Sequence, residues 1–146
     1  MKSVLLATIA AVMMMTTGLA LGEEVEIKML NKGTKGKMVF EPDFVTVNAG
    51  DKVTFVPTDK GHNAEIIKGM IPPGAETFKS KVNSQFSVTL TESGVYGIRC
   101  TPHYGLGMVA LIVVGTAENV EDAKVVKVSA KAKKVFDGLF AQVDAP

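Results

Sequence analysis

The sequence predicts an all-β sandwich followed by a helical tail, and three observations lead to this prediction. Apolar and polar residues alternate through much of residues 24–114, as in half-buried strands. Clusters rich in Gly, Asn, Asp and Pro divide this region at the spacing of sandwich turns. After Gly115 the apolar residues change to a helical period, which indicates that the chain leaves the sheets there.

The alternating segments are short, as expected for the strands of a sandwich. In chain order they contain Val25, Ile27 and Met29; Val45 and Val47; Val53 and Phe55; Phe86, Val88 and Leu90; and Tyr96, Ile98 and Cys100. The turn clusters between them are Asn31-Lys32-Gly33, Asn48-Ala49-Gly50-Asp51, Asp59-Lys60-Gly61, Pro72-Pro73-Gly74 and Glu92-Ser93-Gly94. Residues 109–114 are apolar without interruption, which predicts a last strand that is buried on both faces.

A helix is predicted near the C-terminus, because five apolar residues fall on one side of a helical wheel. These residues are Val135, Phe136, Leu139, Phe140 and Val143. A shorter helix is predicted around residues 120–126, with Asn119 or Thr116 as its N-cap. We expect both helices to pack against one face or end of the sandwich.

The first 22 residues have the features of a secretory signal peptide. Lys2 is followed by an apolar stretch and then by small residues at Ala20 and Gly22, which suit signal peptidase. A membrane anchor is the alternative, since the apolar stretch approaches the length of a spanning helix. The small-residue site favours cleavage after Gly22, which leaves residues 23–146 as one exported domain with no membrane insertion.

Charge and cysteine content exclude several classes of function. The formal net charge is +1 at pH 7 and falls to zero when Lys2 is removed, which argues against a nucleic-acid partner. Cys100 is the only cysteine, so it cannot form a disulfide within the chain. In an oxidising compartment, a single cysteine indicates pairing with another molecule, a reactive thiol or a metal ligand.

Four side chains with metal-binding chemistry stand in a suggestive pattern. Cys100 ends an inward-facing alternation, and His103 and Met108 follow it across a loop that contains Pro and Gly residues. His62, the only other histidine, stands at the start of another strand. Two His, one Cys and one Met match a type 1 copper site in type and number, because soft sulfur ligands hold Cu(I) and imidazole accommodates Cu(II). We expect one copper ion.

Other interpretations of Cys100 remain at this point. A lone cysteine is often a buried structural residue, and zinc could use the same thiolate and imidazoles, although a methionine disfavours it. A Cys-His hydrolase is a further alternative, with Asn63 orienting the base. Such thiols are usually partly exposed and electropositive, whereas Cys100 ends an apolar strand. Copper storage would require more exposed Met and His residues than the chain has.

The motifs KGHN, CTPHYGLGM, MLNKG, MVFEP, DKGHN, MIPPGAE and FKSK resemble the cupredoxins, and among them the pseudoazurins. The spacing C-x2-H-x4-M is shared by plastocyanin-like and pseudoazurin-like proteins. The tail favours the latter, because plastocyanins end with the strand after the Met ligand. The resemblance implies a cupredoxin Greek-key sandwich of about eight strands, with two C-terminal α-helices and copper at one end.

The same resemblance implies a function. Pseudoazurin-like proteins are periplasmic carriers of single electrons in bacteria, and a nitrite reductase is the expected acceptor and a cytochrome c the expected donor. The chain is then a monomeric carrier and not an enzyme. A plastocyanin-like carrier for other redox partners is the alternative within this chemistry.

The resemblance also assigns residues around the copper site. Asn63 resembles the residue whose backbone N–H reaches the Cys sulfur and whose side chain ties the two ligand loops together near Thr101. Pro102 has no N–H, so it cannot give the sulfur a second hydrogen bond. Met38 resembles a methionine near the His103 imidazole, although it could equally fill the core.

A docking surface is expected around His103, whose ring edge is the expected exit for the electron. Met38, Pro102 and Leu106 are candidates for an apolar patch there. Lysines are frequent in this region of the sequence, and those that match the copper end of pseudoazurins predict a basic rim that steers an acidic partner. The rim residues are Lys32, Lys60, Lys79 and Arg99.

Overall fold

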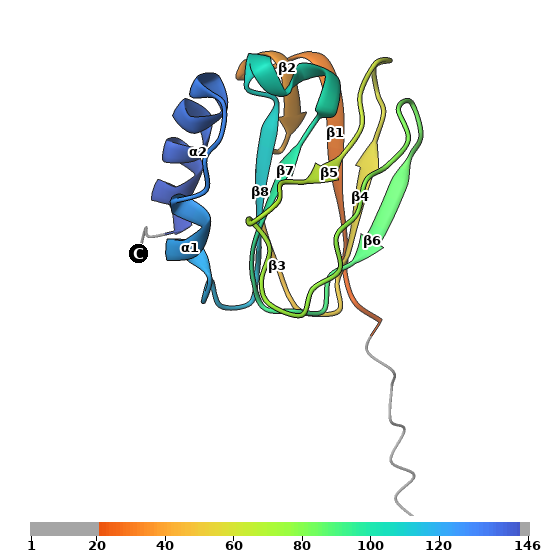
Figure 1. The fold of residues 1–146 in the computed structure, drawn as a ribbon. Coiled ribbons are helices and arrows are strands. Elements are labelled where there is room, and N and C mark those ends of the chain that lie inside the picture. The colour runs from red at the N-terminus through yellow and green to blue at the C-terminus, as the bar shows by residue number, and fades with distance from the viewer. Residues whose placement is uncertain (1–20, 144–146) are drawn as a thin grey trace, which may run out of the picture.

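The computed structural model describes residues 21–143 as two four-stranded sheets that face each other, with two helices outside one of them (Figure 1). The strands are β1 (Glu24–Gly33), β2 (Gly36–Glu41), β3 (Phe44–Val47), β4 (Lys52–Val56), β5 (Glu65–Ile66), β6 (Phe86–Thr89), β7 (Gly94–Arg99) and β8 (Val109–Val114). The other elements are a 3₁₀ helix, η1 (Thr101–Leu106), and the helices α1 (Val120–Lys124) and α2 (Ala130–Val143). The predicted Greek-key sandwich with two C-terminal helices is confirmed.

Both sheets are mixed. One has the order β2-β1-β4-β6, in which β1 pairs antiparallel with β2 and parallel with β4. The other has the order β3-β8-β7-β5, in which β8 pairs parallel with β3 and antiparallel with β7. Alternation did not identify β2 or β5. The backbone of Met38 in β2 has a φ of 54°, so it departs from extended geometry within the strand, and β5 is only two residues long.

The inner core lies between the two sheets. It contains Cys100 and Met108 together with apolar side chains from both sheets, so the expected metal ligands stand at the edge of a packed interior. Its largest fully buried side chains include Ile27, Met29, Phe40, Phe55, Tyr96, Ile98 and Ile112.

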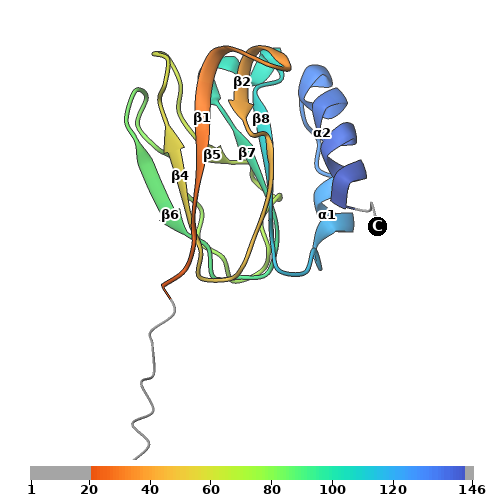
Figure 2. The ribbon, with the colours of Figure 1, turned by 180° about the vertical axis from the view of Figure 1, so that it is seen from behind.

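The outer core lies between the second sheet and the helices. Every residue of β8 is buried, with Ala110, Ile112 and Val114 in the inner core and Val109, Leu111 and Val113 in the outer core. The helices lie along the outer side of this sheet (Figure 2). The apolar run at residues 109–114 is therefore buried on both faces, as predicted.

The stripe on α2 faces the sheet as expected. Phe136, Leu139 and Phe140 are buried in the outer core, and Val135 and Val143 are partly buried against it. The rings of Phe136 and Phe140 lie 5.8 Å apart between centroids. This packing explains why the helix carries apolar residues on one side only.

The capping prediction for α1 is wrong in its mechanism. Asn119 occupies the N-cap position, but its side chain makes no capping hydrogen bond to the helix. Its Oδ1 instead accepts from the N–H of Val95 at 2.7 Å, and its Nδ2 donates to the Val95 carbonyl at 3.1 Å. Thr116 hydrogen-bonds to Glu118. The sequence signal was real, but Asn119 satisfies the backbone of β7 rather than that of α1.

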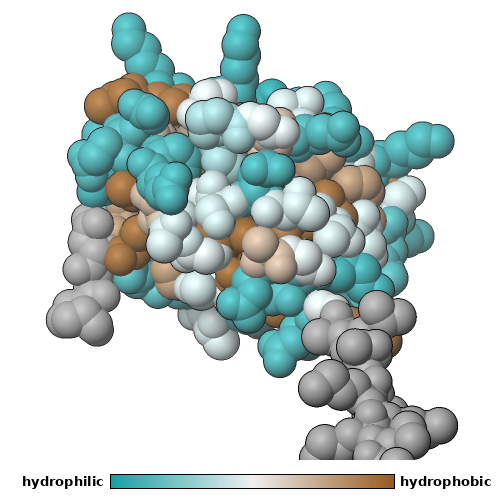
Figure 3. All heavy atoms as spheres, turned by 90° about the horizontal axis from the view of Figure 1, so that it is seen from below, coloured by the Kyte–Doolittle hydropathy of each residue, from teal (hydrophilic) through white to brown (hydrophobic). Residues whose placement is uncertain are grey.

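The two ends of the sandwich differ. Figure 3 shows the end from which residue 21 emerges, where hydrophilic residues and residues of intermediate hydropathy cover most of the surface and hydrophobic residues show between them. The opposite end carries η1 (Figure 1), which contains His103, one of the predicted metal ligands. Except for Leu21 and Gly22, the predicted signal peptide lies outside the described residues.

No helix within residues 21–143 is long and apolar enough to cross a membrane.

Candidate metal centre

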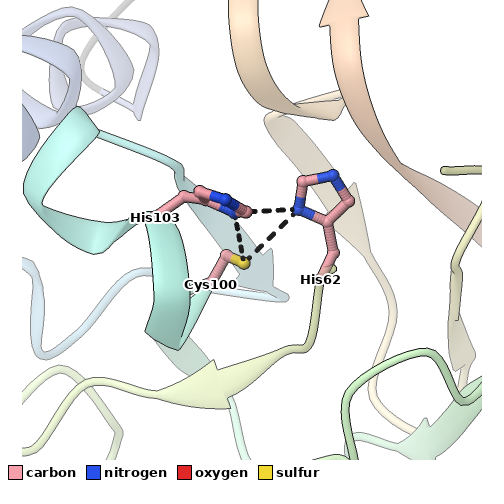
Figure 4. A group of neighbouring side chains, drawn as sticks. All are labelled: His62, Cys100 and His103. Atoms are coloured by element: carbon pink, nitrogen blue, oxygen red, sulfur yellow. Dashed lines mark hydrogen bonds between the residues drawn. The ribbon is translucent and has the colours of Figure 1, made fainter. Parts of the chain in front are cut away.

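Two loops at one end of the sandwich position the predicted ligands, and Figure 4 shows His62, Cys100 and His103 among them. His62 lies between β4 and β5, Cys100 directly follows β7, and His103 lies in η1. The η1 segment is a tight turn with Pro102 in its first turn, and it ends at Gly107, whose φ is 88°. A glycine adopts this left-handed conformation without steric cost. The chain can therefore turn back into β8 immediately after presenting His103.

The donor atoms of these side chains converge. Cys100 Sγ lies 3.6 Å from His62 Nδ1 and 3.6 Å from His103 Nδ1, and the two Nδ1 atoms are 3.1 Å apart. The Met108 sulfur lies near this group, and His62, Cys100 and Met108 have no exposed surface. One thiol, two imidazoles and a thioether thus surround one point, which is the donor set that suits copper.

Backbone hydrogen bonds hold together the loop of residues 100–108, which carries Cys100, His103 and Met108 and is called the Cys100 loop below. The Cys100 N–H donates to the Met108 carbonyl at 3.0 Å, and the Met108 N–H donates to the His103 carbonyl at 3.3 Å. These bonds fix the two ends of the loop against each other. The fixed separation of Cys100 and Met108 follows from strand pairing, because β7 and β8 are adjacent.

Asn31, at the end of β1, orients the His62 ring. Its Oδ1 lies 2.8 Å from His62 Nε2, so it accepts the Nε2 proton and leaves the Nδ1 lone pair facing Cys100. Burial and the nearby His103 lower the pKa of His62, while Asp59 has a smaller opposite effect. The neutral form, which binds metals, is therefore favoured. Sequence reasoning placed Asn31 only in a turn.

Burial raises the pKa of the Cys100 thiol, and hydrogen bonds from the backbone N–H groups of Asn63 and His103 act in the opposite direction. The Asn63 contact matches the role that the resemblance implied. Pro102 has no N–H to donate, and the His103 N–H donates to the Cys100 carbonyl at 3.2 Å. That only one backbone N–H donates to the sulfur stays a prediction.

The side chain of Asn63 links the two ligand loops. Its Oδ1 accepts from the Thr101 N–H at 2.7 Å, and its Nδ2 donates to Thr101 Oγ1 at 3.0 Å. Asn63 Nδ2 also donates to the Ser80 carbonyl at 3.3 Å. Asn63 is buried, so these bonds satisfy groups that water does not reach.

Glu65 is a further residue at this end that the sequence did not reveal. Its Oε2 accepts from Thr101 Oγ1 at 2.7 Å and from Arg99 Nε at 3.0 Å, and its Oε1 lies 3.6 Å from Lys79 Nζ. The hydrogen bond from Arg99 has the largest effect and lowers the pKa of this carboxyl, burial comes second and raises it, and the Thr101 hydrogen bond then lowers it further, so that the pKa lies below its usual value. Two predicted rim cations are thus paired with an acid.

Tyr104 connects η1 with the C-terminal region. The Arg99 guanidinium lies 5.2 Å from the centroid of its ring, a cation–π distance. The Ser129 N–H donates to the Tyr104 hydroxyl at 3.2 Å, and Ser129 Oγ donates to the Tyr104 carbonyl at 3.2 Å. The C-terminal region therefore contacts and supports the Cys100 loop. No local sequence signal indicates this contact.

The predicted docking residues surround this end of the molecule unevenly. Lys32, Lys60 and Pro102 are exposed, His103 is partly exposed, and Leu106 is 53% exposed. The partly buried Met38 packs against the inner core. It also lines, together with Leu106, a groove of about 450 Å³. Its predicted proximity to the His103 ring stays a prediction.

Comparisons with known proteins identify the family. Residues 27–115 match the family described as copper-binding proteins, plastocyanin/azurin family. The chain is 53% identical over 120 residues to a pseudoazurin of Paracoccus pantotrophus, covering 82% of this chain and 83% of that protein. It is 46% identical over 143 residues to a pseudoazurin of Methylorubrum extorquens, covering 97% of each.

A solved structure gives the same result. The refined crystal structure of pseudoazurin from Methylobacterium extorquens AM1 superposes with a TM-score of 0.81 and 50% sequence identity, covering 83% of this chain and 99% of that chain. The similarity extends through the helical tail, which favours pseudoazurins over the plastocyanin alternative. The donor set also fits the metal in the family description. The chain is a member of the plastocyanin/azurin family of copper-binding proteins and, within it, of the pseudoazurins, with copper as its cofactor.

Proposed function

We propose that this type 1 copper electron carrier works in the bacterial periplasm as a monomer, with His62, Cys100, His103 and Met108 as the ligands of one copper ion. It takes electrons from a cytochrome c and passes them to a nitrite reductase. The convergence of the His62, Cys100 and His103 donor atoms within 4.8 Å of one another carries this proposal.

Copper bound there supplies a one-electron couple, Cu(II)/Cu(I), which a mixed sulfur and imidazole donor set accommodates. The protein side contributes a fixed and dry environment. Asn31 sets the His62 tautomer, and the Asn63–Thr101 hydrogen bonds hold the two ligand loops at a constant separation. Ligands that cannot move far keep the rearrangement between oxidation states small.

The exposure of the proposed ligands indicates where an electron leaves the protein. His62 and Met108 are fully buried, whereas His103 is partly exposed beside the exposed Pro102. A partner that covers this surface comes closest to the metal through the His103 ring. Leu106 and Pro102 offer apolar contact, and Lys32 and Lys60 attract an acidic surface.

A hydrolytic role for Cys100 is disfavoured by its surroundings. Reactive thiols have a lowered pKa and some exposure, whereas Cys100 is fully buried and burial raises its pKa. This supports the proposal that the protein is a carrier and not an enzyme.

The first experiment is a copper(II) titration of the purified mature protein, followed by reduction with ascorbate. We expect a strong blue thiolate-to-copper band that saturates at one equivalent and bleaches on reduction. Cys100→Ser should remove the band. A colourless protein with a freely alkylated Cys100 would contradict the ligand assignment.

Export is tested separately. Processing after Gly22 predicts a protein that begins at Glu23 and appears in the osmotic-shock fraction of the source cells. Mass spectrometry of that fraction measures the start of the chain. An unprocessed chain retained with membranes would support the anchor alternative.

A further inference from the structure

The Asn63–Thr101 hydrogen bonds link the His62 loop to the Cys100 loop, and Glu65 contacts this link through the Thr101 hydroxyl. The Thr101 hydroxyl has one hydrogen, and it points to Glu65 Oε2 at 2.7 Å. That hydroxyl must therefore use a lone pair toward Asn63, whose Nδ2 donates to it at 3.0 Å. Asn63 in turn presents Oδ1 to the Thr101 N–H. In this series of hydrogen bonds from Asn63 through Thr101 to Glu65, the donor and the acceptor of each bond are therefore fixed.

Glu65 is itself held in place by backbone and side-chain contacts with two residues, Arg99 and Lys79. It lies in β5, in register with Arg99 of β7, and pairs with Lys79 in an isolated bridge. Both cations also approach its carboxylate, whose side chain is only 16% exposed. A carboxylate so restrained can fix the groups that donate to it, because its charge-assisted bonds are stronger than neutral ones.

We propose that Glu65 is a positioning residue of the metal centre. It orients the Thr101 hydroxyl and thereby locks Asn63 between the His62 loop and the Cys100 loop. The inference rests on the proposed function for the identity of the ligands, but the lock it describes exists without metal.

Two variants separate the acceptor oxygen from the charge. Glu65→Ala removes both, whereas Glu65→Gln keeps a carbonyl oxygen for Thr101 and loses the charge. Asp43→Asn is the matched control, because Asp43 is a carboxylate with 11% side-chain exposure that is also paired with a lysine, Lys35 at 2.6 Å. Lys35 lies between β1 and β2 and is on neither ligand loop.

The first readout is alkylation of Cys100 by iodoacetamide in the metal-free protein. Cys100 is fully buried, so the wild type should react slowly. Glu65→Ala should react about tenfold faster, with Glu65→Gln in between and Asp43→Asn like the wild type. This order should persist across low urea concentrations, since local opening does not depend on global unfolding.

The second readout is copper affinity, measured by competition with a chelator. Outer contacts of metal ligands typically contribute about 10-fold to 100-fold in affinity, and we expect the low end for Glu65→Ala, with partial rescue by Glu65→Gln. A shift in the blue spectrum should accompany it. If Glu65→Ala matches Asp43→Asn in alkylation, the inference is wrong even if copper binds. If copper fails to bind the wild type while Glu65→Ala still accelerates alkylation, the ligand assignment fails and the positioning of Cys100 by Glu65 stands.

Discussion

The inner core and the outer core are similar in composition but differ in what they contain at their edges. Both are built of buried aliphatic and aromatic side chains. The inner core ends in the buried polar residues His62 and Asn63 beside Cys100 and Met108. In the outer core, apolar side chains such as Phe136 and Leu139 pack α2 against β8.

This difference indicates that the polar end of the inner core serves the metal centre, whereas the outer core mainly stabilises the fold. Polar groups at the end of the inner core are each satisfied by a specific partner, such as Asn31 for His62. Such pairings fix direction, which a metal centre requires, whereas apolar contacts mainly contribute free energy of folding. We therefore expect substitutions in the two regions to affect different measurements.

Phe136→Ala is the largest test of this comparison. Removal of a fully packed aromatic ring from the outer core should lower the free energy of unfolding by about 3–5 kcal/mol, because it leaves a cavity between α2 and the sheet. The blue spectrum of the folded protein should not change. Urea unfolding with the spectrum recorded below the transition measures both. Val125→Ala is the control, since Val125 is 79% exposed and should change stability by less than about 0.5 kcal/mol.

Asn119→Ala tests a buried polar link between the tail and β7. The N–H and carbonyl of Val95 would lose their partner, which should cost about 1–3 kcal/mol in unfolding free energy. The exposed neighbour Glu118→Ala serves as the control in the same urea experiment. Equal stability of the two variants would show that the Asn119 hydrogen bonds do not stabilise the fold.

Glu65 should make stability at the metal end depend on pH. Its pKa is lowered from 4.5 in the folded state, so it contributes stability that is fully present above pH 4.5 and lost as pH falls through the lowered pKa. At pH 7 the free energy of unfolding of the metal-free wild type should be about 1–2 kcal/mol higher than that of Glu65→Gln. Unfolding measured between pH 7 and pH 3 should show this difference shrinking. A difference that stays constant would contradict the role of the charge.

The smallest expected effect is that of single surface lysines on the rate of electron transfer to a partner protein. Lys60→Ala and Lys127→Ala make the same change in net charge, but Lys60 lies at the metal end and Lys127 lies between α1 and α2. Lys60→Ala should slow electron transfer to an acidic nitrite reductase about two- to threefold at low salt, because rim charges mainly affect association. The difference should vanish at high salt. Stopped-flow rates across a salt series measure it, and equal slowing by both variants would argue against a localised basic rim.

Much of the fold and the ligand set could be predicted from sequence because their signals are local. The uninterrupted apolar run at residues 109–114 predicted a strand covered on both faces, and the stripe on α2 predicted what covers one of them. The ligands stood out because the chain has only one Cys and two His. The spacing of Cys100, His103 and Met108 lies within one loop, which sequence displays directly.

The remaining site residues depend on contacts between distant segments. Asn31 reaches His62 across 31 positions, and Thr101 reaches Glu65 across 36. A turn asparagine and a strand glutamate carry no local mark of these roles. Sequence placed Asn119 correctly at the N-cap of α1 but not the role of its side chain, because a cap and a bridge to β7 use the same residue type.

The sequence by itself determined the period of each segment and the chemical identity of the proposed copper donors, since hydrophobic periodicity and side-chain chemistry are properties of the chain. Only the tertiary structure decided which polar groups complete the centre. The pairing of β5 with β7 brings Glu65 to Thr101, and the end of β1 brings Asn31 to His62. The physical reason is that hydrogen bonds act over about 3 Å, a distance that is set by strand register and not by position in the sequence.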